Sequence, residues 1–246
     1  MSRKSAIVVG VGAEMGLGAA LCRRFAAEGH HVFVAGRTPE KIERVVASIA
    51  AAGGGAEAVA TDATKEGEVV RLFDRAFAPS AERDGVDLVV FNAGNNRRMD
   101  FREVPAALFE EFWRVGCFAG FLVGREAARR LVPLGRGTVI FTGASGSLRG
   151  KPGFAQFAAA KAGLRMISQS MAREYGPLGI HVAHTVIDGG IHGERLLQNR
   201  PDALAERGAD GLLDIDAIAE SYWRIHRQPR SAWTQEIELR PFKETF

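Results

Sequence analysis

The stretch that decides the fold is GVGAEMGLG, from Gly10 to Gly18. It follows the apolar run AIVVG, typical of a buried strand, and it opens a helical pattern from Met15 to Glu28. In such a loop we expect Gly12 to permit a tight turn, Gly16 to let the backbone approach a pyrophosphate, and Gly18 to let the helix pack on the sheet. The helix N-terminus would offer unpaired N–H groups and positive dipole charge to phosphates. The alternative is a glycine-rich turn with no ligand.

Strand and helix patterns alternate along the rest of the chain. The further apolar runs are HVFVAG, AEAVATD, VDLVVFNAG, GTVIFTG, GIHVAHTVI and EIELR. The helical patterns between them cover Pro39 to Ala52, Glu66 to Phe77, Val104 to Leu131, Phe154 to Tyr175, and Asp216 to Arg227. Continuous Val and Ile runs separated by helices are typical of a parallel sheet covered on both faces. The sequence therefore predicts one α/β domain over residues 1–246, a Rossmann-like doubly wound parallel sheet of about seven strands.

Residues 188–213, DGGIHGERLLQNRPDALAERGADGLL, have no strand pattern and carry several glycines and a proline. They follow the carboxyl end of a strand, which is where open α/β sheets bind ligands. We expect this segment to form a mobile lid over the substrate.

Composition excludes several functional classes. The chain is 46% hydrophobic and 25% charged, as in an ordinary globular protein, and its net charge of +3 comes from scattered residues rather than a basic run, which argues against nucleic-acid binding. No uninterrupted apolar segment is long enough to span a membrane. Cys22 and Cys117 form neither a disulfide framework nor a metal motif. A reducing, cytoplasmic location is the expectation.

Four motifs in order make the chain similar to the short-chain dehydrogenase/reductase family: the glycine loop, Asp62 after the third strand, Asn92-Ala93-Gly94 after the fourth, and the helix of Lys161. The resemblance covers essentially the whole chain. It implies an NAD(P)-dependent oxidoreductase with a small-molecule substrate, assembled as a homodimer or homotetramer through its two long helices. The cofactor-binding residues that it implies, with those expected from the loop, are Gly12, Gly16, Leu17, Gly18, Arg37, Asp62, Ala63, Asn92, Ala93, Gly94, Lys161 and Ile191.

The chain also departs from the family pattern on this side. Asp188-Gly189 stands where the family has Pro-Gly, and Val11, Glu14 and Met15 replace the usual threonine and the usual small or polar residues.

The end of the second strand favours NADP over NAD, although NAD remains an alternative. An NAD site places a carboxylate there for the ribose 2′-hydroxyl, whereas this chain has Gly36 followed by Arg37. A guanidinium suits a 2′-phosphate. Against this, Glu14 could repel the phosphate, or Arg37 could simply cap a surface turn.

The proton-handling side of the site differs more deeply. The family has a tyrosine four residues before its lysine, a serine thirteen residues before the tyrosine, and an asparagine on the preceding long helix. The corresponding residues here are Phe157, Ala144 and Gly116, so that only Lys161 remains. The chain resembles an atypical subset of the family that carries phenylalanine with the lysine retained.

Several nearby groups could replace the missing donors. A one-residue shift could present Ser145, whereas Thr142 is expected to belong to the strand and Ser147 lies farther along the turn. His192 could face the nicotinamide, or it could be a solvated lid residue. Weaker candidates for hydrogen bonds to substrate are Asn95, Asn96 and Gln156. His181 and His184 are expected on opposite faces of one strand, so no metal site is predicted.

Two functions remain open from the sequence. The first is an NADP-preferring oxidoreductase with an atypical active site and an unidentified substrate. The second is a non-catalytic NADP(H)-binding sensor or oligomer partner.

Overall fold

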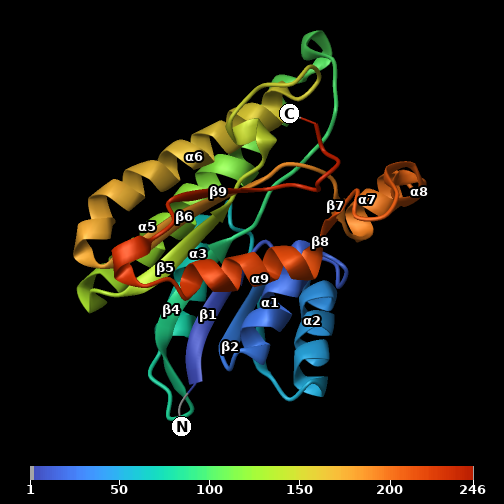
Figure 1. The fold of residues 1–246 in the computed structure, drawn as a ribbon. Coiled ribbons are helices and arrows are strands. Elements are labelled where there is room, and N and C mark those ends of the chain that lie inside the picture. Colours follow the sequence, from blue (N-terminus) through green and yellow to red (C-terminus); the bar gives the residue numbers. More distant parts are fainter. Residues whose placement is uncertain (1–2, 246) are drawn as a thin grey trace.

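A computed structural model describes residues 3–245 of the chain. Its centre is a sheet of seven parallel strands in the order β3-β2-β1-β4-β5-β6-β9 (Figure 1). The strands are β1 (Arg3–Val9), β2 (His31–Gly36), β3 (Gly55–Ala60), β4 (Arg83–Phe91), β5 (Gly137–Thr142), β6 (Ile180–Ile187) and β9 (Glu236–Leu239). The order reverses between β1 and β4, and this confirms the predicted single-domain, doubly wound, Rossmann-like α/β fold.

Helices cover both faces of this sheet. The helices are α1 (Leu17–Ala27), α2 (Pro39–Ala51), α3 (Glu66–Phe77), α4 (Ala106–Trp113), α5 (Ala119–Leu131), α6 (Ala155–Tyr175) and α9 (Ile215–His226). One apolar core joins the sheet to α1, α2 and α9, and a second joins its other face to α3, α5 and α6. The Val, Ile and Phe side chains of the central strands alternate between these two cores, which explains why these strands are apolar on both faces.

The helix predicted from Val104 to Leu131 is not regular. It begins at Ala106, after the N-cap residue Pro105, and a π-helical turn over Arg114–Phe118 separates α4 from α5. Single π turns inside α-helices occur often at functional sites. This one contains Gly116, the position where the family has its asparagine.

The segment predicted as a lid is more ordered than its sequence indicates. It forms the two-residue strand β7 (Ile191–His192), the short helices α7 (Glu194–Asn199) and α8 (Ala203–Arg207), and the start of β8 (Leu213–Asp214). The expectation of no strand was wrong, because β7 and β8 pair in parallel, but two residues are too few to show a periodicity. Helices α7 and α8 project from the main body beyond the carboxyl ends of the strands (Figure 1).

Within residues 3–245, no helix combines the length and the apolar character needed to cross a membrane.

Candidate active site

The glycine loop is tightly packed at its two ends and open in the middle. Gly10 has φ +92°, and a Cβ there would lie 2.4 Å from the Ala93 backbone nitrogen. A Cβ on Gly18 would lie 3.0 Å from the Gly10 carbonyl oxygen, so this glycine does let α1 pack closely on the sheet. A Cβ on Gly12 would meet no atom within 4 Å. The left-handed turn is therefore at Gly10 rather than Gly12, and Gly12 borders open space before the N-terminus of α1.

The segment after β4 closes one side of this space. The Asn92 backbone N–H donates to the Val9 oxygen at 2.8 Å, and its side-chain amide donates to the Gly10 oxygen at 3.3 Å. Asn92 thus ties the glycine loop to β4. Gly94 leaves room for a neighbour, because a Cβ there would lie 3.0 Å from the Lys161 Nζ.

The ends of β2 and β3 form the outer side of the loop. A Cβ on Gly36 would lie 2.1 Å from the Val11 oxygen, so the backbone here admits no side chain at position 36. Arg37 is exposed. Burial alone would raise the pKa of Asp62, but hydrogen bonds from Thr64 and the charges of Lys65 and Arg37 hold it below its usual value. Ala63, beside it, is buried.

Lys161 lies in the centre of the site. Its buried ammonium donates to the Thr142 oxygen at 2.7 Å and to the Ala93 oxygen at 3.5 Å, so that it bridges the ends of β5 and β4. Burial, with the charge of Arg195, lowers the pKa of Lys161 to about 8. Both hydrogen bonds are to neutral carbonyls, and no carboxylate among residues 3–245 forms an ion pair with this ammonium.

Arg195 is a site residue that the sequence did not indicate. It lies on α7, and its guanidinium donates to the Gly94 oxygen at 3.1 Å and to the Asn96 oxygen at 3.4 Å. The Glu194 N–H also donates to the Met15 oxygen at 2.8 Å, so the lid touches both the glycine loop and the segment after β4. A helical pattern after Ile191 could have indicated that Arg195 faces the site. Helix α7 has only six residues, which is too short to show such a pattern.

Phe157 and Ser145 line one pocket of about 280 Å³ beside the site. Ser145 begins a 3-10 turn, Ser145–Ser147, and is half-buried, whereas Ala144 before it is buried. The structure thus places Ser145 and Phe157 in the lining of the same pocket. Gly146 follows in the turn, and a Cβ there would lie 2.8 Å from Phe157 Cε1.

The asparagine position is closed by packing. Gly116 is buried in the π turn, and a Cβ there would lie 2.9 Å from the Ala160 Cβ of α6. No side chain fits at position 116 without a shift of one helix.

Buried polar networks hold the surrounding backbone. Ser147 Oγ lies 3.3 Å from His184 Nε2, and His184 Nδ1 lies 2.9 Å from Glu236 Oε2. Burial lowers the pKa of His184 to about 4, so the ring is neutral at pH 7. Thr142 belongs to β5 as expected, and its hydroxyl bonds the Tyr222 hydroxyl at 2.9 Å.

Three other candidates have partners in the protein or lie at the edge of the site. Gln156 is fully buried and donates to the Arg97 oxygen at 2.6 Å, so its amide nitrogen is not directed at a substrate. Asn95 donates to Glu111. His192 pairs with Asp214 in the β7–β8 register.

Asp188, where the family has proline, is buried and binds two arginines. Its Oδ2 accepts from Arg149 Nη2 at 2.6 Å and also from Arg240. Both guanidiniums hold the pKa of Asp188 below its usual value, although burial opposes this. Sequence reasoning noted the substitution without finding its partners, because Arg149 and Arg240 are far from it along the chain.

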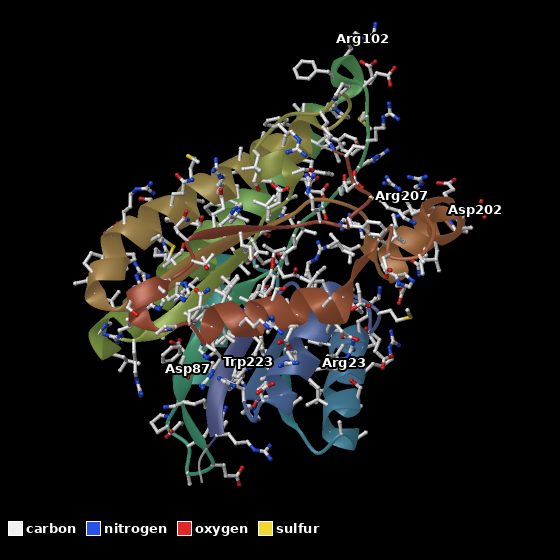
Figure 2. All side chains as sticks on the ribbon, in the orientation of Figure 1. Arg23, Asp87, Arg102, Asp202, Arg207 and Trp223 are labelled. Atoms are coloured by element: carbon white, nitrogen blue, oxygen red, sulfur yellow. The ribbon has the colours of Figure 1, made fainter. Side chains whose placement is uncertain are left out.

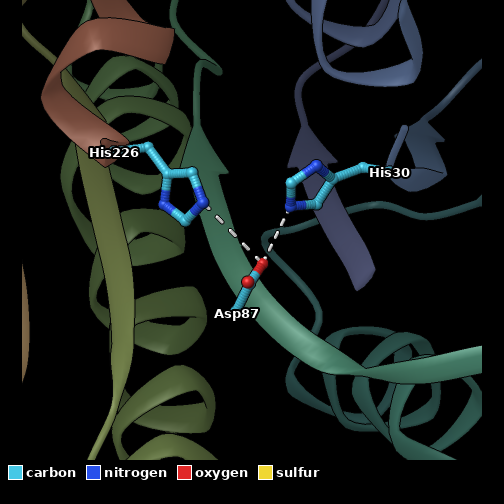
Figure 3. A group of neighbouring side chains, drawn as sticks. All are labelled: His30, Asp87 and His226. Atoms are coloured by element: carbon cyan, nitrogen blue, oxygen red, sulfur yellow. Dashed lines mark hydrogen bonds and ion pairs between the residues drawn. The ribbon is translucent and has the colours of Figure 1, made fainter. Parts of the chain in front are cut away.

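The one group with metal-ligand spacing among residues 3–245 lies elsewhere. His30 Nε2 is 2.9 Å and His226 Nε2 is 3.9 Å from Asp87 Oδ1 (Figure 3). His181 and His184, considered from the sequence, are not part of it. Figure 2 places Asp87 near the amino ends of the strands, far from the pocket beside Arg207.

Comparisons with known proteins agree with this geometry. The family model described as "short chain dehydrogenase" matches residues 4–200. The chain is 33% identical over 224 residues to "Uncharacterized oxidoreductase YuxG" of Bacillus subtilis, a match that covers 90% of this chain but only 32% of that protein. It therefore spans about a third of the length of this relative. It is 35% identical over 216 residues to "3beta-hydroxysteroid dehydrogenase 1" of Eggerthella lenta, covering 83% and 79% of the two chains.

Among solved structures, it is similar to a short-chain dehydrogenase from Rhodopseudomonas palustris, with 39% identity, a TM-score of 0.81, and 97% and 99% of the two chains covered. The family match, the strand order and the position of Lys161 agree. The chain belongs to the short-chain dehydrogenase family of oxidoreductases.

Proposed function

We propose that this chain is an NADP(H)-preferring oxidoreductase acting on a small molecule through an active site without the family's tyrosine, serine and asparagine. The observation that carries the proposal is the buried ammonium of Lys161 at the centre of the site. Burying a charged group without an ionic partner is costly, so a lysine with only structural duties would be replaced readily. A binding role explains its retention.

The residues around Lys161 fit a nicotinamide dinucleotide. The open space at Gly12 lies before the N-terminus of α1, where free N–H groups suit a pyrophosphate. Lys161 and Ile191 would border the nicotinamide riboside, and Asp62 and Ala63 the adenine. These roles are carried over from the family.

The preference for NADP rests on β2. The backbone admits no carboxylate side chain at position 36, and Arg37 beside it is exposed and available to a 2′-phosphate. An Arg–phosphate contact is often bidentate and is among the stronger charge-assisted hydrogen bonds.

The substrate half limits the chemistry. The nicotinamide would supply the hydride. Phe157 donates no proton, and Ala144 gives the substrate oxygen no hydrogen bond. A positioned general acid is worth about 10²–10⁴-fold and an oxyanion donor about 10²–10³-fold, so alcohol–ketone chemistry would be slow. We propose the hydroxyl of Ser145, which lines the pocket, as the substitute donor.

A reaction that depends less on the missing tyrosine fits this site better. Hydride addition to an activated C=C bond is such a reaction, since solvent can protonate the resulting carbanion. The second candidate function is a non-catalytic NADP(H) sensor or oligomer partner, which the closed packing at Gly116 favours.

A binding assay and a turnover assay separate the two functions. We expect calorimetry to give NADPH binding in both cases, and NADPH oxidation on a panel of enones, enoates and ketones only for the oxidoreductase. Tight binding without turnover would support the sensor, and absence of NADPH binding would contradict both.

Assembly and location complete the proposal. Helices α5 and α6 expose Phe121 and Met166, which are 42% and 51% exposed, on the helices that pair in family oligomers. We therefore propose a homodimer or homotetramer through this face. The two unpaired cysteines, Cys22 and Cys117, fit a reducing cytoplasm.

A further inference from the structure

The pocket beside Phe157 is lined by more cationic than anionic side chains. The four cationic residues are Arg149, Lys151, Arg200 and Arg207, and the two carboxylates are Asp188 and Glu244. Arg149 and Lys151 follow β5, Arg200 and Arg207 belong to the lid, and Glu244 follows β9. Figure 2 shows Arg207 beside the C-terminal segment, at the junction of lid and main body.

The ion pairs in this pocket do not use all of the positive charge. Arg207 pairs with Glu244 at 2.8 Å, and Arg200 pairs with Glu206 outside the lining. Lys151 is exposed and forms no ion pair within the described chain. Among the described residues, the lining is therefore net positive.

Arg149 is held in place with most of its donors unused. Its Nη2 donates to Oδ2 of the buried Asp188, and Arg240 donates to the same oxygen. No hydrogen bond from Nε or Nη1 of Arg149 to any of residues 3–245 is present, and the side chain is 35% exposed. A guanidinium fixed at one nitrogen and open at the others is suited to bidentate recognition of an anion.

This positive region is separate from the expected cofactor phosphates. The pocket lies at the ends of β5 and β6, whereas the glycine loop and Arg37 lie at the ends of β1 and β2. With β4 between them in the sheet order, one phosphate group cannot serve both places.

We propose that the substrate carries an anionic group, a carboxylate or a phosphate, and that Arg149 binds it. This inference rests on the proposed function, because it assigns the substrate class of the same site. Asp188 and Arg240 act as positioning residues that fix the Arg149 guanidinium. Lys151 adds charge at the pocket mouth. If Arg149 binds the anionic group at one end of the substrate, the reacting carbon at the other end would lie toward Phe157 and the nicotinamide.

The test compares three probes with the same six-carbon polyol skeleton: D-gluconate, D-glucitol 6-phosphate and uncharged D-glucitol. Binding of each is measured by calorimetry on the full chain, with and without saturating NADPH. The variants are Arg149→Gln, Asp188→Asn and the matched control Arg102→Gln. Arg102 pairs with Asp100 on a 3-10 turn, does not line the pocket, and lies well away from the pocket residue Arg207 in Figure 2.

We expect one of the two anions to bind at least tenfold more tightly than glucitol, because charge-assisted hydrogen bonds are about twice as strong as neutral ones. Which anion binds distinguishes carboxylate from phosphate. Arg149→Gln should remove this preference, Asp188→Asn should reduce it, and Arg102→Gln should leave it unchanged. NADPH affinity should be the same in wild type and Arg149→Gln. Because the buried Asp188 keeps only Arg240 as a partner in this variant, its unfolding midpoint should fall, and binding is measured well below that midpoint.

Equal binding of all three probes, failure of all three to bind at millimolar concentration, or an unchanged preference in Arg149→Gln would overturn the proposal. If Asp188→Asn lowers the unfolding midpoint, Arg149→Gln alone decides. If the wild type does not bind NADPH, the proposed function is refuted. If it binds NADPH but shows no preference for an anionic probe, only the proposed substrate class is refuted.

Discussion

Replacing Lys161 by methionine should separate what this residue costs in stability from what it contributes to cofactor binding. Burial lowers its pKa from 10.5 to about 8. One pKa unit corresponds to about 1.36 kcal/mol, so holding the ammonium charged in the folded protein costs about 3 kcal/mol. This cost is fully present below pH 8 and disappears as the pH rises toward 10.5, because only the unfolded chain still binds the proton there.

The assay is urea unfolding of wild type and Lys161→Met between pH 7 and 10.5. The variant's advantage in free energy of unfolding, relative to wild type, should shrink by about 3 kcal/mol across this range. Lys41→Met, on helix α2 outside the site, is the matched control variant. A wild-type-minus-variant difference that does not vary with pH would refute the reasoning.

The same residue predicts a proton uptake. If NADPH restores the Lys161 charge, its binding at pH 8 should take up about half a proton, measured by calorimetry in buffers of different ionisation enthalpy. Lys161→Met should take up none and should bind NADPH about ten- to a hundredfold more weakly.

Four further outcomes are expected. Arg37→Asp should weaken NADPH binding far more than NADH binding in calorimetry, and equal losses would remove Arg37 as the discriminating residue. Phe157→Tyr alone should restore little ketone reduction in an NADPH oxidation assay; substantial wild-type activity that falls in this variant would mean that another donor already serves the pocket. Burial lowers the pKa of both His184 and His226 to about 4, so the contribution of each neutral histidine to stability should be fully present above pH 6.5 and fall by up to about 3 kcal/mol as the pH drops to 4; urea unfolding of wild type, His184→Gln and His226→Gln would detect this. Phe121→Glu should lower the mass found by light scattering at micromolar concentration, and a monomeric wild type would contradict the proposed assembly.

The centre of the sheet was predictable because β1, β2 and β5 are nearly continuous apolar runs, and a glycine follows or ends each of them at the carboxyl edge. The edge strands β3 and β9 carry glutamates and gave a weaker pattern. Helix α3 was placed at its observed bounds, since Glu66 and Phe77 limit a strong amphipathic pattern. The π turn over Arg114–Phe118 was not, because it changes the hydrogen bonding of the helix without a distinctive residue pattern.

The site residues also fall into two groups, those that a local sequence relation predicts and those that only the fold brings together. Lys161 was found from its spacing to Phe157 on one helix face, which is a local relation. The contacts of Arg195 with Gly94 and of Asp188 with Arg149 and Arg240 join segments far apart in sequence. A single sequence contains no distance between such segments, so only the folded chain brings them together.

The close packing of Gly116 against Ala160 limits which residues position 116 can hold. Once the two helices have closed to where a Cβ at position 116 would lie 2.9 Å from its neighbour, regaining the asparagine requires the helices to separate first. An asparagine at position 116 would therefore report first on the packing of these two helices, and only a variant that keeps its unfolding midpoint would report on catalysis.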